Sequence, residues 1–206
     1  MKKSLLAMLL AVALVAPVVA AEKNMWIGGS LGYQSVSATN SKGKSTDMNS
    51  LTIAPEFGYS LNEKWDIGLD LAYTTGKGYK SSVGALKTNI DVSSEPDVSD
   101  FSIAPFARYH VANIAGIDVM LKGSLLYGKT TYKGDSKEMN LTEFGIAIAP
   151  VVSYSINETW SIGATLNFLE LGYYSLSDDD SDGKYSEFGF NVNDGSLISI
   201  GFSYHF

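Results

Sequence analysis

Cysteine is absent from this chain of 206 residues, and histidine occurs only twice. Without cysteine, the protein has neither disulfide bonds nor thiolate metal sites to hold it together. Beyond residue 21, no apolar run approaches the roughly 20 residues that a membrane-spanning helix needs. These absences exclude a helical membrane protein, and they require a fold that is stabilised by closed hydrogen-bonded structure.

Basic residues are also scarce. The chain has 15 lysine and arginine residues against 22 aspartate and glutamate residues, and two of the lysines lie in the first three positions. Removal of these two leaves 13 basic residues against 22 acidic ones, a formal charge of −9. Because binding to phosphate backbones needs a basic surface, this balance argues against a nucleic-acid partner.

The first 21 residues have the pattern of a secretory signal peptide. Lys2 and Lys3 form a positive beginning, residues 5–15 form an apolar run, and residues 17–21 include small residues suited to cleavage. We expect cleavage after Ala20 or Ala21. The remainder, residues 22–206, shows no linker or break in composition and is predicted to form one domain.

The clearest strand pattern lies in residues 65–73, which read WDIGLDLAY. Bulky apolar side chains alternate there with carboxylates and small residues, which indicates a strand with one apolar and one polar face. A stretch of nine residues with an aromatic residue at each end is typical of a tilted strand that crosses a hydrocarbon layer.

An internal repeat organises the rest of the chain. The motif I-A-P-x-x-x-Y occurs at residues 53–59, 103–109 and 148–154, and each copy precedes a short polar break and another alternating run. Each copy therefore predicts a hairpin with a tight turn. With further strands expected at residues 25–36 and 197–206, the total is eight strands. Long polar loops are expected at residues 37–49, 76–99, 129–140 and 175–196.

The two faces of these strands differ sharply in polarity. The polar face is rich in small residues, which suit the crowded lumen of an eight-stranded barrel, whereas a soluble barrel such as a lipocalin would turn its apolar face inward. The charged residues assigned to the lumen are Glu56, Asp66, Asp70, Arg108, Asp118, Lys122 and Glu143. Aromatic residues gather at the strand ends, as in an interfacial girdle. They include Tyr59, Trp65, Tyr73, Tyr109, Tyr127, Tyr154 and Trp160.

These patterns predict an all-β fold, an eight-stranded antiparallel up-and-down transmembrane β-barrel. Closure of the barrel would satisfy every backbone polar group within lipid. Pro55, Pro105 and Pro150 lie within predicted strands, where each removes a hydrogen-bond donor. We expect each proline to mark a β-bulge that helps the barrel to twist and close.

The last eight residues, SIGFSYHF, resemble the assembly signal of Gram-negative outer-membrane proteins through Ser199, Gly201, Tyr204 and Phe206. The sequence after the signal peptide resembles the small eight-stranded outer-membrane barrels of the OmpA/OmpX-like group. This resemblance implies insertion by the barrel-assembly machinery into the cell outer membrane, in contact with lipid and lipopolysaccharide. It also implies tight turns in the periplasm and long loops outside. Many relatives continue into a peptidoglycan-binding domain, and we expect none here.

The lumen charges admit two interpretations. Unpaired charges in a narrow interior of low dielectric would be costly, so Arg108 and Lys122 should pair with the lumen carboxylates and fill the barrel. The pairs could hold the strands in register. Alternatively, they could form a gate over a small pore, which resembles a proposal made for this family. A lumen that side chains can fill argues against an open diffusion porin.

Neither histidine suits a lipid-modifying enzyme at the outer leaflet, which would need a histidine base beside a serine at the long-loop end. His110 and His205 lie near the tight turns instead, so we expect no enzyme and no cofactor. Residues 178–183, DDDSDG, match the first half of a calcium-binding EF-hand loop, but its twelfth position is Gly189 rather than glutamate. Asp178, Asp180 and Asp182 are therefore expected to be solvated charges of an exposed loop, with cation binding as the alternative.

The sequence thus favours a monomeric, rigid barrel that displays four variable loops, because long loops usually carry the specificity of such a scaffold. Its expected role is structural, or adhesive through contact with a host or another extracellular ligand. A narrow gated pore for ions or small solutes is the alternative.

Overall fold

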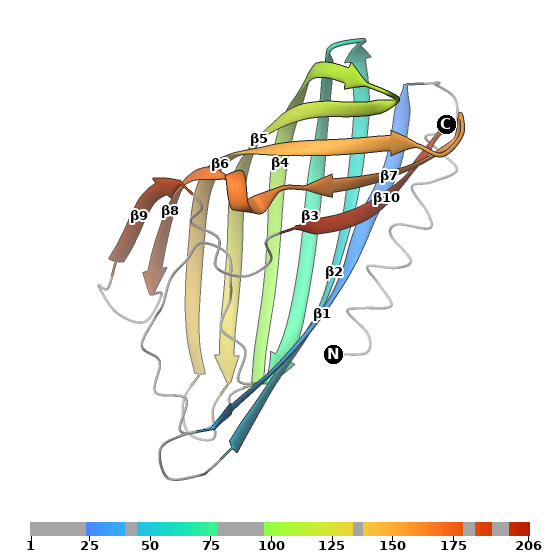
Figure 1. Cartoon of the computed structure of the whole chain (residues 1–206). Helices are drawn as coiled ribbons and strands as arrows, with labels where there is room; N and C mark the ends of the chain where they lie inside the picture. The colour runs from blue at the N-terminus through green and yellow to red at the C-terminus, as the bar shows by residue number, and fades with distance from the viewer. Residues whose placement is uncertain (1–23, 40–44, 78–96, 134–137, 179–183, 191–197) are drawn as a thin grey trace.

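The computed structural model describes residues 24–39, 45–77, 97–133, 138–178, 184–190 and 198–206. The predicted signal peptide lies outside these residues, so its cleavage stays a prediction. The structure contains ten strands and one short 3₁₀ helix (Figure 1). They are β1 (Met25–Thr39), β2 (Ser45–Asn62), β3 (Trp65–Lys77), β4 (Asp97–Ile114), β5 (Ile117–Lys133), β6 (Glu138–Ser155), β7 (Trp160–Thr165), η1 (Asn167–Leu169), β8 (Leu171–Asp178), β9 (Lys184–Phe190) and β10 (Ser199–His205).

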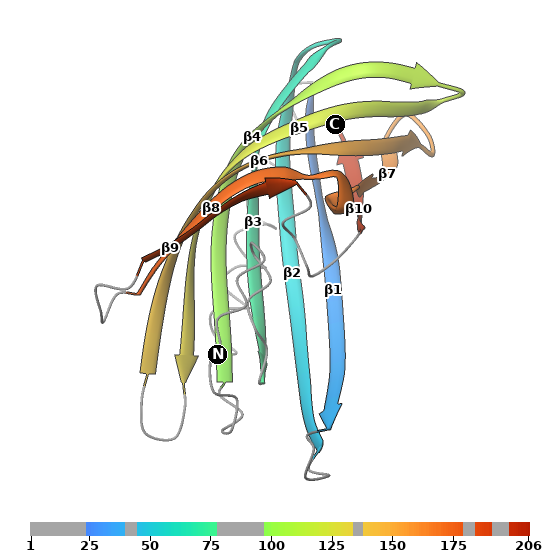
Figure 2. The same ribbon diagram turned by 60° about the vertical axis from the view of Figure 1, so that its left-hand side comes forward.

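The ten strands occupy the eight positions of a closed antiparallel barrel. Strands β1 to β6 pair in sequence order. The seventh position is shared by β7 and β8, which pair with successive stretches of β6. The eighth position is shared by β9, which pairs with β8, and β10, which pairs with β7 and with β1 over Trp26–Gly29. The sheet curls on itself so that β10 lies beside β1 (Figures 1 and 2), whereas β9 pairs with β8 and not with β1 among the described residues. This eight-position antiparallel barrel confirms the predicted fold.

The tight turns lie together at one end of the barrel, here called the turn end, and the opposite end is called the loop end (Figure 1). Three of the turns are built on an asparagine side chain. Asn113 Oδ1 accepts a hydrogen bond of 3.2 Å from the backbone N–H of Gly116. Asn62 Oδ1 accepts hydrogen bonds from the backbone N–H groups of Lys64 (2.8 Å) and Trp65 (3.1 Å). Asn157 Oδ1 accepts equivalent bonds from Thr159 and Trp160. An asparagine that bonds to backbone two or three residues ahead explains why the strand stops there.

The two faces of the wall have the predicted polarity. Large apolar side chains such as Leu121, Ile146 and Phe202 remain about half exposed on the outside. Arg108 and Lys122, by contrast, are each only 9% exposed in the interior. This distribution is the reverse of a soluble protein and fits a wall that faces lipid. In the described part of the chain, no helix is long and apolar enough to cross a membrane.

The strands extend further at the loop end than the sequence predicted. The polarity of residues 37–49, 76–99, 129–140 and 175–196 suggested loops, but ladder pairing continues well into each of these ranges. For example, β5 runs to Lys133 and β6 begins at Glu138, so that only residues 134–137 separate them. Backbone pairing does not require an apolar side chain, and the polar composition therefore marked the end of the lipid-facing band rather than the end of the strands.

The outward face changes character where the strands leave that band. On β5, the outward positions of residues 117–127 are mainly apolar and end at Tyr127, which is 53% exposed. The next outward positions are Lys129, Thr131 and Lys133. A switch from apolar to polar side chains on the same face of one strand indicates a passage from lipid to water.

The inward face changes in the opposite sense over the same stretch. Val98, Tyr132 and Leu141 are buried together inside the loop end, with Met139 and Leu176 packed against them. We call these five residues the loop-end core. The sequence predicted a polar lumen throughout, so this apolar cluster was missed. In the protruding part of the wall, apolar side chains therefore face inward and polar side chains face outward, as in a water-soluble sheet.

The prediction of a β-bulge at each repeated proline is wrong. Register is unchanged across Pro55 and Pro105, where the ladder skips two pairs and then resumes in step. The bulges lie instead near the turns, at Ser60/Asn62 and His110/Ala112. A missing donor removes a hydrogen bond without adding a residue, so proline by itself does not shift the register.

Pro150 has a different neighbour, because the seventh barrel position breaks opposite it. Strand β7 ends at Thr165, η1 follows, and β8 resumes the pairing with Ile148 through Leu171. The backbone N–H of Leu166 donates to the Pro150 carbonyl at 2.9 Å, and that of Glu170 donates to the Asn167 carbonyl at 3.1 Å. These bonds provide partners for backbone groups on both sides of the break, in a wall where lipid offers none.

The boundary between lipid and water can be tested with two arginine substitutions. Leu121→Arg places a charge within the apolar band and should lower the free energy of unfolding by about 2–4 kcal/mol, whereas Ser99→Arg, beyond Phe101 on β4, should cost about 0–1 kcal/mol. Equilibrium urea unfolding in lipid vesicles measures both values. Equal costs at the two positions would show that the band is placed wrongly.

Candidate functional site: the charged lumen

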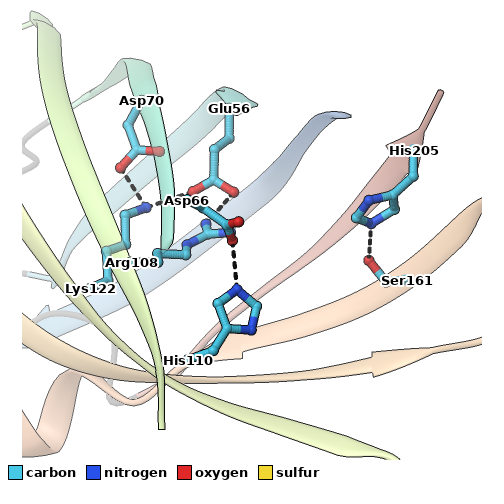
Figure 3. A network of polar contacts seen from close by, with 8 residues as sticks. All are labelled: Glu56, Asp66, Asp70, Arg108, His110, Lys122, Ser161 and His205. Atoms are coloured by element: carbon cyan, nitrogen blue, oxygen red, sulfur yellow. Dashed lines mark hydrogen bonds and ion pairs between the residues drawn. The ribbon is translucent and has the colours of Figure 1, made fainter. Parts of the chain in front are cut away.

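Four charged side chains from four neighbouring strands meet in the lumen. Lys122 Nζ lies 2.5 Å from Glu56 Oε2 and 2.6 Å from Asp70 Oδ2, and Arg108 Nη2 contacts Glu56 Oε1 (Figure 3). The direct cross-strand partners of Arg108 are Asp66 on β3 and Lys122 on β5, and the juxtaposition of the two cations would be repulsive alone. Glu56 lies between the two cations and compensates both of them. We call Glu56, Asp70, Arg108 and Lys122 the lumen charge cluster.

Two buried aromatic rings support the cations of this cluster. The Arg108 Cζ atom lies 4.7 Å from the ring centroids of both Trp26 and Phe106, and Lys122 Nζ lies 4.1 Å from that of Phe106. Both rings are at most 5% exposed. Cation–π contact of this kind stabilises a desolvated charge. Sequence reasoning missed both aromatic residues, although alternation places Phe106 on the same face as Arg108.

Glycine makes room for these rings. A β-carbon added at Gly58 would collide with the indole of Trp26, and one at Gly68 would collide with the ring of Phe106. Both glycines lie at inward positions of β2 and β3, in register with the rings that cover them. Small residues at the lumen face therefore serve to admit large neighbours from adjacent strands, as an eight-stranded interior requires.

The two histidines form separate pairs at the turn end. His110 Nε2 lies 2.9 Å from Asp66 Oδ2, and His205 Nε2 lies 2.9 Å from Ser161 Oγ (Figure 3). Asp66, predicted to belong to the lumen charges, thus pairs with His110 and lies opposite Arg108 in the ladder between β3 and β4. The two pairs lie apart in the close view, so they do not form one constellation.

Two other predicted lumen residues lie away from the cluster. Asp118 accepts a hydrogen bond from Asn113 Nδ2 at 2.7 Å in an exposed hairpin, and it is the second residue of β5, at the turn end. Glu143 is 2% exposed, and its Oε1 has no hydrogen-bond partner among the described residues. Lys122 pairs with Ala149 on β6. Ala149 lies six residues from Glu143 on that strand, or about 20 Å at the usual strand rise. The Lys122 side chain therefore cannot reach Glu143.

The predicted interfacial aromatics occupy outward positions at the two edges of the apolar band. At the turn end, the Trp65 and Tyr109 ring centroids are 5.0 Å apart, and those of Trp160 and Tyr204 are 5.1 Å apart. Tyr127 and Tyr154 are exposed, and Tyr59 and Tyr73 are half-buried. This placement agrees with a girdle at each membrane interface.

The residues of the predicted assembly signal take part in barrel closure. Ser199 Oγ accepts a hydrogen bond from Asn167 at 2.9 Å. A β-carbon at Gly201 would lie 2.9 Å from the Gly29 carbonyl oxygen of β1, so glycine permits the close approach of these strands. The rings of Tyr204 and Phe206 are 5.1 Å apart. Their recognition by an assembly machinery stays a prediction.

The acidic segment that resembles half of an EF-hand loop falls largely on residues 179–183, which lie outside the described residues. Asp178 is the last residue of β8, and Gly189 pairs with Gly172 in the ladder between β8 and β9. The twelfth position of an EF-hand loop would therefore lie in a strand. Across the described ranges, no group of three or more histidine, cysteine, aspartate or glutamate residues is arranged to hold a metal.

A cavity of about 330 Å³ lies beside the lumen charge cluster. Its lining includes all four charged residues of the cluster, together with Asn167, Glu170 and Tyr174 from the seventh barrel position. The Tyr174 hydroxyl donates a hydrogen bond of 2.6 Å to Glu170 Oε1. The lumen is therefore hollow between its charged cluster and this tyrosine–glutamate pair.

An antiparallel barrel with an apolar exterior and ion pairs inside defines a transmembrane β-barrel. The chain belongs to the family described as outer membrane protein beta-barrel domain, which matches residues 4–206. The protein is thus an outer-membrane β-barrel protein. No curated protein sequence matches the chain closely enough to count as a relative.

Several solved structures are similar to it in part. Neisserial surface protein A is 18% identical, with a TM-score of 0.44, over 90% of this chain and 98% of that one. Ail, the attachment invasion locus protein of Yersinia pestis, is 12% identical, with a TM-score of 0.41, over 89% of this chain and 99% of that one. A major outer membrane protein from Thermus thermophilus is 12% identical, with a TM-score of 0.41, over 88% of this chain and 99% of that one.

Removal of Lys122 tests the energetics of the lumen charge cluster. Lys122→Met should lower the free energy of unfolding by about 3–5 kcal/mol, because Glu56 and Asp70 would remain buried with one cation between them. The matched control is Lys133→Met, which breaks the exposed contact of 3.6 Å between Lys133 and Glu138 and should cost about 1 kcal/mol or less. Urea unfolding in lipid vesicles measures both, and similar values would contradict a buried network.

Proposed function

We propose that this protein is a surface scaffold of the outer membrane, with a structural role or a role in adhesion through its loop end. The loop end then faces the outside of the cell and the turn end faces the periplasm. Outer-membrane lipid and lipopolysaccharide are the proposed surroundings of the apolar band, and the barrel-assembly machinery is the proposed route of insertion.

The reversal of polarity at the loop end is the observation that carries this proposal. Beyond Tyr127, strand β5 turns polar residues outward, while Val98, Tyr132 and Leu141 form the loop-end core. The paired strands β5 and β6 thus project from the lipid-facing band as a folded unit with its own buried side chains. A rigid projection of this kind presents a defined surface to a partner, since little conformational entropy is lost on binding.

The state of the lumen also supports a scaffold. The charge cluster and the rings of Trp26 and Phe106 occupy the turn-end half of the described lumen, and the loop-end core lies on the inner face of the opposite end. Side chains that pair across the interior hold the strands in register. An interior with packed side chains at both ends fits a rigid body better than a wide diffusion channel.

The absence of cysteine allows a clean test of orientation. Lys133→Cys, in an exposed position at the loop end, should react with a membrane-impermeant maleimide on intact cells, whereas Glu63→Cys, in an exposed turn, should react only after lysis. Labelling of Glu63→Cys on intact cells would reverse the proposed orientation.

Adherence of cells that carry the protein to an epithelial monolayer should fall when residues 134–137 are replaced by two glycines while the barrel stays folded.

A narrow gated pore is the second candidate, and the cavity beside the lumen charge cluster favours it. Ion pairs that can exchange partners could connect this cavity to the turn end, since Glu56 already bonds to both Arg108 and Lys122. Such a pathway would admit only ions or small solutes.

Conductance in planar bilayers distinguishes the two candidates. A pore predicts well-resolved single-channel steps that Lys122→Met or Arg108→Met abolishes and that Lys133→Met leaves unchanged. A scaffold with a filled lumen predicts no such steps in the unaltered protein.

A further inference from the structure

The repeated I-A-P motif has a steric consequence that a scaffold does not need. Its three alanines, Ala54, Ala104 and Ala149, all line the cavity of about 330 Å³. Small residues such as Ser124 and Gly163 line it as well. Protein interiors are normally packed without voids larger than a water molecule, and a lumen of eight strands is narrow enough for side chains to fill. The repeat therefore keeps open a space that larger residues would close.

The side of the cavity formed by the charge cluster presents mainly carboxylate. The side chains of Asp70 and Glu56 are 29% and 17% exposed, whereas those of Arg108 and Lys122 are 10% and 11% exposed. Both cations lie against aromatic rings, Arg108 between Trp26 and Phe106 and Lys122 against Phe106. Although the cluster holds equal numbers of acidic and basic groups, the accessible groups are chiefly acidic.

The other side of the cavity carries a carboxylate with few partners. The break at η1 brings Glu170 to the cavity, where the residue is 7% exposed. The Tyr174 hydroxyl donates to Glu170 Oε1, and no other side chain in the described ranges donates to this carboxylate. The buried lysine and arginine of the described chain are Lys122 and Arg108, which already pair with Glu56 and Asp70. Glu170 therefore has a hydrogen-bond donor but no opposite charge among these residues, and burial of an uncompensated charge is costly.

We propose that this cavity binds a small organic cation through a primary ammonium group held between Asp70 and Glu170. An ammonium group carries three donors and no acceptor, which suits two carboxylates, and charge-assisted hydrogen bonds of this type are strong. The volume lies at the lower end of the range for small-molecule pockets, about 300–1,000 Å³. The alanine, glycine and serine residues of the lining leave room for a short alkyl body. Among the described residues, no group of three or more histidine, aspartate or glutamate side chains is arranged to hold a bare metal ion.

Calorimetric titration of the full folded chain in detergent micelles tests this proposal, with n-butylammonium chloride as the probe at constant chloride concentration. Saturable binding is expected, and Glu170→Gln should weaken it at least about tenfold, as the loss of a charged hydrogen-bond partner implies. Glu63→Gln, in an exposed turn, is the matched control and should leave the affinity unchanged. Tetramethylammonium, which has no N–H donor, and sodium should not compete.

A second variant separates binding in the cavity from partition of the probe into the micelle. Ala149→Leu fills the cavity without a change of charge and should abolish binding, while circular dichroism confirms the folded barrel. If that variant does not fold, Tyr174→Phe replaces it, because loss of the hydroxyl removes the group that orients Glu170 and should weaken binding. The proposal is overturned if sodium binds as well as n-butylammonium, or if Glu170→Gln and the folded second variant leave the affinity unchanged. Neither result depends on which way the loop end faces.

Discussion

The structure depends on one constraint: each backbone polar group in the lipid-facing wall must find its hydrogen-bond partner within the protein. Closure between β1 and β10 meets this constraint at the turn end. The same requirement explains how the wall treats its irregularities. The ladder passes Pro55 and Pro105 without a change of register, and the break opposite Pro150 is spanned by backbone bonds from Leu166 and Glu170.

Closure with eight strands makes the interior narrow, and the narrow interior decides the placement of charge. Glu56 compensates two cations at once, and Trp26 and Phe106 cover the cations on the side away from the cavity. Acidic groups remain more accessible than basic ones as a result. The interior is therefore not a uniform polar filling: it has a charged cluster, a hollow with acidic sides and an apolar core at the loop end.

The edge of the lipid-facing band and the ends of the strands are two separate boundaries. Composition marks the first one, because outward residues are polar beyond Tyr127 on β5 and before Phe101 on β4. It did not locate the second, since Thr130 and Tyr132 continue the ladder with inward side chains while Lys129 and Thr131 face outward. Reading polar stretches as loops therefore shortened the strands and concealed the loop-end core.

Alternation and the repeat, together with the small residues of the polar face and the aromatic residues at the strand ends, determined that this chain forms eight lipid-facing barrel positions with tight turns at one end. A soluble barrel alternates as well, but it has neither a small-residue polar face nor an aromatic girdle. The same patterns also identified Glu56, Asp70, Arg108 and Lys122 as interior groups. Only the tertiary structure decided that Glu56 bridges the two cations, that Asp118 and Glu143 lie apart from them, and that the seventh barrel position breaks to bring Glu170 inward. These outcomes depend on strand tilt and register, which set diagonal neighbours across the lumen and leave no local signal in the sequence.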